Sequence, residues 1–177
     1  MTKCVAPPLG MGRTFQISNV IADITCLENV VLAAMGADPR KWTMHRSVDS
    51  FPELRRAAAE GLALVGLGDR VEDAVRRLSY GERRQLELAL ALTGRPRVLL
   101  LDEPCAGLSP AERARISTLI AGLPRDLTVL MIEHDMDVAL GLADRVTVLH
   151  RGRVILEGSP GEVQAHPEVR EVYFGHV

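Results

Sequence analysis

The sequence predicts an α/β fold with a mostly parallel sheet and an additional helical segment. Three apolar runs alternate with helical stretches between residues 97 and 150, and a helical segment spanning 25–77 precedes them. The runs lack the polar alternation of a half-exposed antiparallel strand, so we expect them to be buried and parallel. They are Val98–Leu101, Thr128–Ile132 and Val146–Leu149.

Helix-start signals and apolar periodicity predict helices at 26–35, 53–66, 82–93 and 110–122. Several begin with a capping box, in which a hydroxyl and a glutamate three residues later satisfy free backbone N–H groups. The boxes pair Thr25 with Glu28, Ser79 with Glu82, Ser109 with Glu112, and Ser159 with Glu162. We also expect a polar connection at 42–51 and a hairpin that turns at Arg151-Gly152 into Val154–Leu156.

The composition is typical of one globular domain: 177 residues, of which 47% are hydrophobic and 25% charged. A net charge of -2 gives no electrostatic case for a nucleic-acid partner. No apolar run approaches the roughly 20 residues that cross a bilayer, and the first residues do not resemble a signal peptide. We therefore expect an intracellular protein that reaches a membrane only through a partner. Cys4, Cys26 and Cys105 lack metal-ligand spacing, so we expect small buried hydrophobic residues there.

Two adjacent acidic residues, Asp102 and Glu103, follow the first apolar run. Ligands of α/β proteins bind at the carboxyl ends of strands. Neighbouring residues that leave a strand point in different directions, so the two acids can have different roles. Asp102 could hold Mg²⁺, usually through water, and Glu103 could polarise an attacking water. The alternative is a helix-capping aspartate beside a solvated glutamate.

His134 follows the second apolar run, at a place that corresponds to the acidic pair. A neutral imidazole there could donate a hydrogen bond to a phosphate and position a water. We expect His134 and the acidic pair to converge on one phosphate pocket. The alternative is an ordinary surface histidine at a strand end.

The segment Ser79-Tyr80-Gly81-Glu82 opens a predicted helix. Free N–H groups and the positive end of the helix dipole form an anion site there. Gly81 would let a phosphate approach the backbone, and the Ser79 hydroxyl would add a donor. For Ser79 and Glu82 by themselves, a plain capping box is the favoured explanation, but a capping box does not require a glycine in the first turn.

These motifs together resemble the ATP-binding subunits of ABC transporters, and specifically the subgroup that serves branched-chain amino-acid importers. The resemblance extends over essentially the whole chain. Gly-Arg-Thr-Phe-Gln16 is similar to the Q-loop, Leu-Ser-Tyr-Gly-Glu82 to the signature, and Leu-Leu-Leu-Asp102-Glu103-Pro to the Walker B motif. Ala106-Gly-Leu-Ser109-Pro is similar to the D-loop, Ile-Glu-His134-Asp-Met to the H-loop, and the ending through Gly175 to the tail of the subgroup.

The resemblance implies a P-loop NTPase core that is incomplete at its N-terminus, together with a helical subdomain. It divides the chain into a Q-loop region (1–24), the helical subdomain (25–78), the core with the signature, Walker B, D-loop and H-loop (79–157), and a C-terminal helical tail (158–177). The implied cofactors are ATP and Mg²⁺. The implied partners are a second ATP-binding subunit, identical or not, and transmembrane permease subunits, so the chain would lie at the inner face of the membrane.

The same resemblance assigns roles to individual residues. Asp102 and Gln16 would serve the metal, Glu103 would be the general base, and His134 and Gln16 would sense the γ-phosphate. The residues from Ser79 to Glu82 (Ser79, Tyr80, Gly81 and Glu82) would bind the nucleotide held by the partner. Gln16 itself lies in a segment without periodicity, so only the resemblance identifies it.

The sequence contains no Gly-x-x-x-x-Gly-Lys-Ser/Thr loop. In the family fold, the strand before that loop lies between the strands that match 128–132 and 146–149. We expect its loss to expose apolar strand edges, and Pro7-Pro8 makes residues 1–12 a poor replacement. Because losing one preorganised donor can cost about 3–4 kcal/mol in catalysis, we predict that this chain alone binds ATP poorly and hydrolyses it negligibly.

Two functions follow from the sequence. The first is an ATP-binding, ATP-hydrolysing subunit of an importer for branched-chain amino acids. The second is a catalytically silent module that binds nucleotide only in trans, by offering its signature helix to an intact partner. Nucleotide titration with and without an intact homologous subunit would separate the two.

Overall fold

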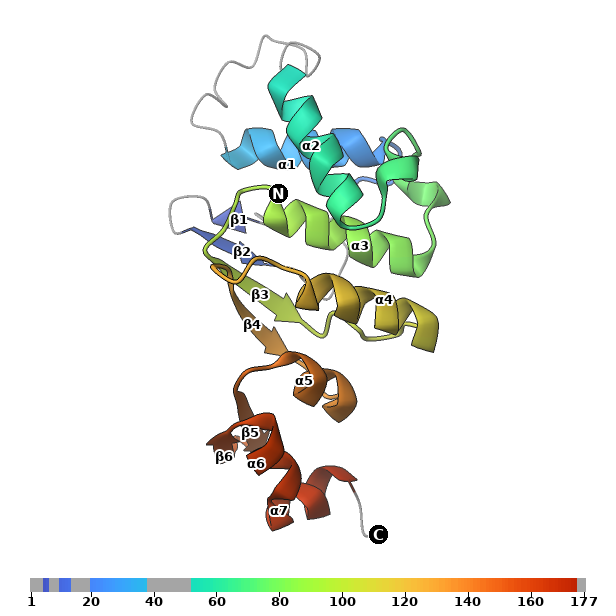
Figure 1. Cartoon of the computed structure of the whole chain (residues 1–177). Coiled ribbons are helices and arrows are strands. Elements are labelled where there is room, and N and C mark those ends of the chain that lie inside the picture. The colour runs from blue at the N-terminus through green and yellow to red at the C-terminus, as the bar shows by residue number, and fades with distance from the viewer. Residues whose placement is uncertain (1–4, 7–9, 14–19, 38–51, 175–177) are drawn as a thin grey trace. The chain divides into compact units, whose positions relative to one another are not determined.

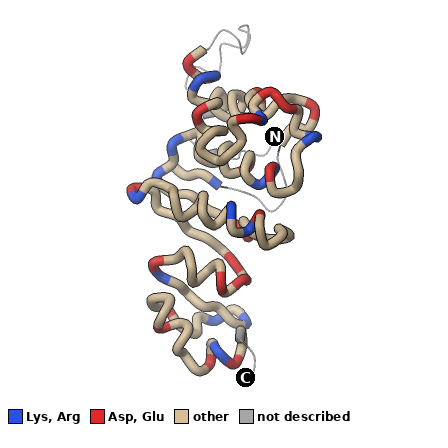
Figure 2. The backbone as a smooth tube through the Cα atoms, turned by 45° about the vertical axis from the view of Figure 1, so that its right-hand side comes forward, with Lys and Arg blue, Asp and Glu red and all other residues tan. Residues whose placement is uncertain are grey.

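The computed structural model describes residues 5–6, 10–13, 20–37 and 52–174. The chain forms two compact units, residues 1–132 and 133–177 (Figure 1). Acidic and basic residues are present in both units (Figure 2). The predicted connection at 42–51 lies outside the described residues.

The first unit contains a four-stranded sheet in the order β1-β2-β3-β4. β2 pairs with β3, and β3 with β4, in parallel, which confirms parallel pairing for the first two apolar runs. β1 pairs antiparallel with β2. The strands are β1 (Val5–Ala6), β2 (Met11–Arg13), β3 (Val98–Asp102) and β4 (Thr128–Ile132). The sequence did not predict β1 and β2, since two or three residues are too few for a period to show.

All four predicted helices are present in this unit. α3 is buried around most of its surface and contacts β2 and the other three helices. It begins two residues earlier than predicted. The helices are α1 (Cys26–Ala37), α2 (Pro52–Leu64), α3 (Tyr80–Leu92) and α4 (Pro110–Ala121), with short 3-10 helices η3 (Gly68–Arg70) and η4 (Val75–Arg77) before α3.

Helix α3 forms the centre of the first unit. Leu86 of α3 is fully buried, as are Leu62 of α2 and Leu99 of β3. Burying such a side chain stabilises a fold by about 1.5–3 kcal/mol. The start of α3 is therefore fixed by the packing of its body.

The predicted capping boxes are confirmed in the structure. Thr25 Oγ1 accepts from the Glu28 N–H at 3.1 Å, and the Glu28 carboxylate accepts from the Thr25 N–H at 2.7 Å. The same reciprocal pair of bonds opens α3, α4 and α6 (Pro160–Ala165). A Ser or Thr cap typically contributes about 1 kcal/mol, so local sequence alone fixes where these helices begin.

The second unit consists of a β-hairpin covered by short helices. β5 (Val146–His150) pairs antiparallel with β6 (Arg153–Gly158), and the predicted turn at Arg151-Gly152 is confirmed. Both turn residues have positive φ, 47° and 76°. Val148, Val163 and Val169 form its small core. The remaining elements are α5 (Met136–Leu142), α6, α7 (Pro167–Val169) and a π-helical turn, η5 (Arg170–Phe174).

The prediction of three buried parallel strands is wrong in two respects. In the described residues, β5 pairs only with its hairpin partner and is antiparallel, because the two-residue turn returns the chain directly along it. β4 lies at the edge of the described sheet, where Leu130 and Ile132 are both 61% exposed. The exposed apolar edge that we expected is thus confirmed for β4.

Two of the three cysteines behave as expected. Cys26 and Cys105 are buried free thiols. Burial, together with the nearby charge of Asp73, raises the pKa of Cys26 to about 11. This thiol is therefore a small apolar core residue at neutral pH, and its reactivity is suppressed.

Among the residues with defined positions, none of the helices is long and apolar enough to cross a membrane. The predicted boundaries at residues 24, 78 and 157 remain predictions, although α1 and α2 pack within the same unit as the sheet.

Candidate functional site

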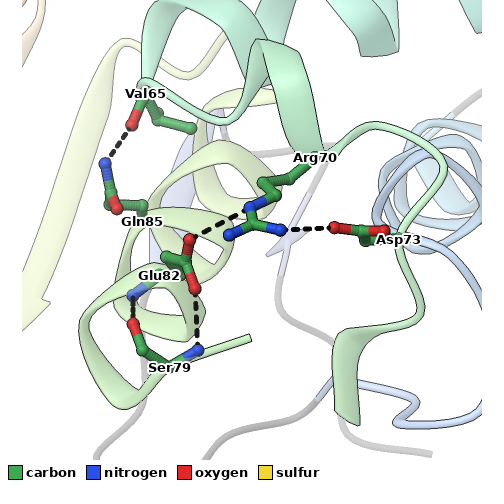
Figure 3. A network of polar contacts seen from close by, with 6 residues as sticks. All are labelled: Val65, Arg70, Asp73, Ser79, Glu82 and Gln85. Atoms are coloured by element: carbon green, nitrogen blue, oxygen red, sulfur yellow. Dashed lines mark hydrogen bonds and ion pairs between the residues drawn. The ribbon is translucent and has the colours of Figure 1, made fainter. Parts of the chain in front are cut away.

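Ser79, Tyr80, Gly81 and Glu82 gather at the start of α3, as the sequence predicted. Ser79 Oγ accepts from the Glu82 N–H at 3.2 Å, and the Glu82 carboxylate accepts from the Ser79 N–H at 2.8 Å (Figure 3). Ser79 and Tyr80 are exposed. An anion site and a plain capping box are thus both compatible with this geometry, because the capping box leaves the hydrogen of the Ser79 hydroxyl available to a phosphate.

Glu82 also joins the start of α3 to the turn before it. Arg70 Nε lies 3.3 Å from one Glu82 oxygen, and Arg70 donates to Asp73 at 2.9 Å (Figure 3). The hydrogen bond to Asp73 and the charges of Glu82 and Asp73 raise the pKa of Arg70. One turn further, Gln85 donates to the carbonyl of Val65 at 2.6 Å. The start of α3 is therefore held by the residue that follows α2 and by η3.

Gly81 is buried, and the group that covers it is the side chain of Glu112 from α4. A Cβ atom placed on Gly81 would lie 2.5 Å from Glu112 Oε1 and 2.8 Å from its Cδ. No side chain larger than hydrogen fits there while Glu112 keeps this position. Sequence reasoning identified Glu112 only as a helix cap. Nothing in the sequence signalled its contact with a residue 31 positions earlier.

A second contact between α3 and the following loop involves Tyr80. Its hydroxyl accepts from Arg84 at 2.8 Å and donates to the carbonyl of Ala106 at 3.4 Å. Gly107 has a φ of +73°, and a Cβ atom placed on it would lie 3.4 Å from the Tyr80 ring. Arg84 in turn pairs with Glu87 at 3.0 Å, and both side chains are more than nine-tenths buried. Sequence reasoning missed this cluster, because no local pattern reports that Arg84 and Glu87 are both buried.

The acidic pair lies where β3 ends. Asp102 is the last residue of β3 and is paired in register with Ile132 of β4. Its carboxylate is 32% exposed and lies 4.0 Å from the Arg13 guanidinium of β2. The next residue, Glu103, donates its N–H to the Ile132 carbonyl at 2.9 Å. The sheet therefore fixes the backbone of both acids.

Glu103 has a positive φ of 46°. This left-handed conformation costs roughly 1–2 kcal/mol for a residue with a Cβ, and such strain is concentrated at functional sites. The strand ends at Asp102, and the chain changes direction at Glu103. The division of roles between the two acids stays a prediction.

His134 belongs to the second unit, so its position relative to the acidic pair stays a prediction. It is exposed and immediately precedes Asp135, the N-cap of α5, whose carboxylate accepts from the Asp137 and Val138 N–H groups. Gln16 lies outside the described residues.

Asp102 is suited to hold a divalent cation only as one ligand among several. Within the described ranges, no three His, Cys, Asp or Glu side chains are grouped so that they could hold a metal ion. Mg²⁺ usually takes one or two carboxylates and completes its shell with water and substrate phosphates. A half-exposed carboxylate at a strand end fits that requirement.

Comparison with known proteins places these features in a family. Residues 3–106 match the family model described as ABC transporter, and residues 153–177 match the model described as branched-chain amino acid ATP-binding cassette transporter. The first match includes the acidic pair and the start of α3. The second covers β6 and the helices after it.

Individual relatives agree with the family models. The chain is 34% identical to the high-affinity branched-chain amino acid transport ATP-binding protein LivG of Salmonella typhimurium, over 94% of this chain and 68% of LivG. It is 33% identical to BraF of Pseudomonas aeruginosa, which has the same description, over the same shares of the two chains.

Solved structures show the same relationship. The ADP conformation of an ATP-binding cassette of an ABC transporter matches with a TM-score of 0.79 and 28% identity, over 96% of this chain and 70% of that one. The CbiO1 protein from Clostridium perfringens, part of an ABC transporter complex, matches with a TM-score of 0.76 and 28% identity, over 94% and 64%. The chain therefore belongs to the family of ABC transporter ATP-binding proteins and has the P-loop NTPase fold of their ATPase domain.

Proposed function

We propose that this chain is an ATP-binding subunit of an importer for branched-chain amino acids and that it hydrolyses ATP only within the assembled importer, since we predict negligible hydrolysis by the chain alone. The observation that carries the proposal is the similarity to LivG and BraF over 94% of the chain, including the matched tail at 153–177. The relatives are transport ATP-binding proteins, and their comparison gives no support to a catalytically silent module.

The acidic pair would carry the chemistry. Mg²⁺ bound with ATP would neutralise the charge that develops on the transferred phosphoryl group. Asp102 would hold that ion through its half-exposed carboxylate. Glu103, which follows the strand and has a positive φ, would accept a proton from the attacking water. His134 and Gln16 would contact the γ-phosphate.

The start of α3 would bind the nucleotide of a second ATP-binding subunit, because the N–H groups there and the Ser79 hydroxyl favour an anion. The Tyr80 and Glu112 contacts join this segment to the loop that follows the acidic pair. The two subunits would act on a transmembrane permease, with the chain at the inner face of the membrane.

The test is transport by an assembled importer. The chain would be reconstituted in lipid vesicles with a branched-chain amino-acid permease, its binding protein and a second ATP-binding subunit. We expect uptake of radiolabelled leucine that requires the chain and Mg-ATP, and much weaker uptake of lysine and glutamate. Leucine uptake equal to that of vesicles lacking the chain would contradict the proposal, as would a preference for a charged amino acid.

A further inference from the structure

The proposed nucleotide-binding face of α3 is partly covered by the chain itself. Ser79 and Tyr80 are exposed, but Gly81, the residue that would let a phosphate approach the backbone, is buried. The Glu112 Oε1, Cδ and Cγ atoms are the three nearest atoms to the space beside Gly81. A negatively charged carboxylate thus lies where the proposed function requires a phosphate.

Glu112 is held in this position from several sides. One of its carboxylate oxygens accepts from the Ser109 hydroxyl at 2.6 Å and from the Ser109 N–H at 3.0 Å. The other oxygen is the one nearest to Gly81. The Ser109 hydroxyl first, then the Ser109 and Gly81 N–H groups, lower the pKa of Glu112, and nearby Arg115 acts in the same direction. The group is therefore ionised at neutral pH.

We infer that Glu112 is a further residue of the nucleotide site: its carboxylate competes with phosphate for the start of α3 and sets the affinity of that face. The inference rests on the proposed function of Ser79–Glu82. A phosphate that reaches the Gly81 N–H must displace the carboxylate or bind beside a like charge. In water, two unit charges about 4 Å apart alter an equilibrium roughly fivefold.

The capping boxes supply a matched pair of variants. Glutamine can replace glutamate in a capping box, so Glu112→Gln removes the charge and keeps the helix start. Glu162→Gln makes the same change in the equivalent Ser-Pro-x-Glu box of α6, in the other unit. Equal thermal unfolding midpoints of the two variants would show that both retain the fold.

The experiment titrates the full chain with inorganic tripolyphosphate and follows the backbone amide of Gly81 by ¹⁵N NMR. We expect the Glu112→Gln variant to reach half-saturation at a roughly fivefold lower concentration than the unchanged protein. The Glu162→Gln variant should match the unchanged protein. Midpoints that agree across all three proteins, or a Gly81 signal that no concentration shifts, would overturn the inference.

This outcome is separable from that of the transport test, because it requires neither permease nor turnover. A chain that fails to support leucine uptake but shows the fivefold difference would retain Glu112 as a competitor for anions and lose only the importer role. A chain that supports uptake and shows no difference would retain the importer role without this use of Glu112.

Discussion

Arg84 donates a hydrogen bond of 2.8 Å to the hydroxyl of Tyr80, and its guanidinium carbon lies 5.2 Å from the centre of the Tyr80 ring. Tyr80 in turn contacts Ala106 and Gly107 in the loop after the acidic pair. A buried cation in α3 therefore positions an aromatic ring against that loop. The two halves of the proposed nucleotide machinery in this chain are joined by a few side chains.

The first prediction follows from the buried pair of Arg84 and Glu87. Removing one member leaves an uncompensated buried charge, so Arg84→Met should lower the free energy of unfolding by about 3 kcal/mol. Replacing both, as Arg84→Met with Glu87→Leu, should cost much less, because no charge is then left unpaired. Urea unfolding of the three proteins measures both values. A double variant less stable than Arg84→Met would show that the pair itself stabilises the fold.

The second prediction follows from the contact of Gly81 with Glu112. Gly81→Ala should lower the unfolding midpoint, because the new methyl group must displace Glu112 from its bonds to Ser109. Gly61→Ala in α2 is the matched control. The space beside Gly61 is open, so this change should stabilise the protein by about 0.5–1 kcal/mol. Calorimetry of both variants tests the contrast, and equal stabilisation by the two alanines would contradict it.

The third prediction follows from the positive φ of Glu103. Glycine adopts this conformation without strain, so Glu103→Gly should raise the free energy of unfolding by about 1 kcal/mol while it removes the proposed base. Arg151→Gly, at a φ of 47° in the hairpin turn, should stabilise similarly and leave ATP turnover unchanged. Chemical denaturation and ATPase assays of the assembled importer test both parts. A destabilised Glu103→Gly variant would show that the backbone there is not strained.

The fourth prediction concerns how the stability of the protein depends on pH. Hydrogen bonds from Ser109 lower the pKa of Glu112 in the folded state, and those from Ser159 lower that of Glu162. A carboxylate whose pKa is lowered in the folded state stabilises the protein at pH values above the pKa of the unfolded state, about 4.3. This stabilisation is lost as the pH falls through the pKa of the folded state. Unfolding midpoints should therefore decline below about pH 4.3, and less steeply in the Glu112→Gln, Glu162→Gln double variant. Parallel curves for the two proteins would contradict this assignment.

The sequence predicted most of the elements, because their signals are local. Capping boxes at Thr25, Ser79, Ser109 and Ser159 marked helix starts, since each box satisfies its own N–H groups within four residues. The Arg151-Gly152 turn could be predicted for the same reason. The burial of β4 and the pairing of β5 were predicted wrongly. An apolar run indicates a strand, but its partners and coverage depend on distant segments.

In the candidate site, too, local patterns could be predicted from the sequence and contacts between distant residues could not. Asp102 and Glu103 were identifiable because an apolar run ends directly in two acids. The contact of Glu112 with Gly81, and that of Tyr80 with Gly107, join residues more than 25 positions apart. No local pattern reports such a contact, and the φ of Glu103 is equally invisible in the sequence. These features arise only when distant segments pack together.

The most direct test of the proposed function is ATP turnover by the assembled importer when a single carboxylate is changed to an amide. Glu103→Gln keeps the shape of the proposed base and removes its ability to accept a proton, while Glu53→Gln makes the same change at an exposed position of α2. The second ATP-binding subunit carries a glutamine in place of its own general base in every assay, so the measured turnover comes from this chain. We predict that Glu103→Gln lowers Mg-ATP hydrolysis at least 100-fold and that Glu53→Gln leaves it unchanged. Equal turnover by the two variants would contradict the role assigned to the acidic pair.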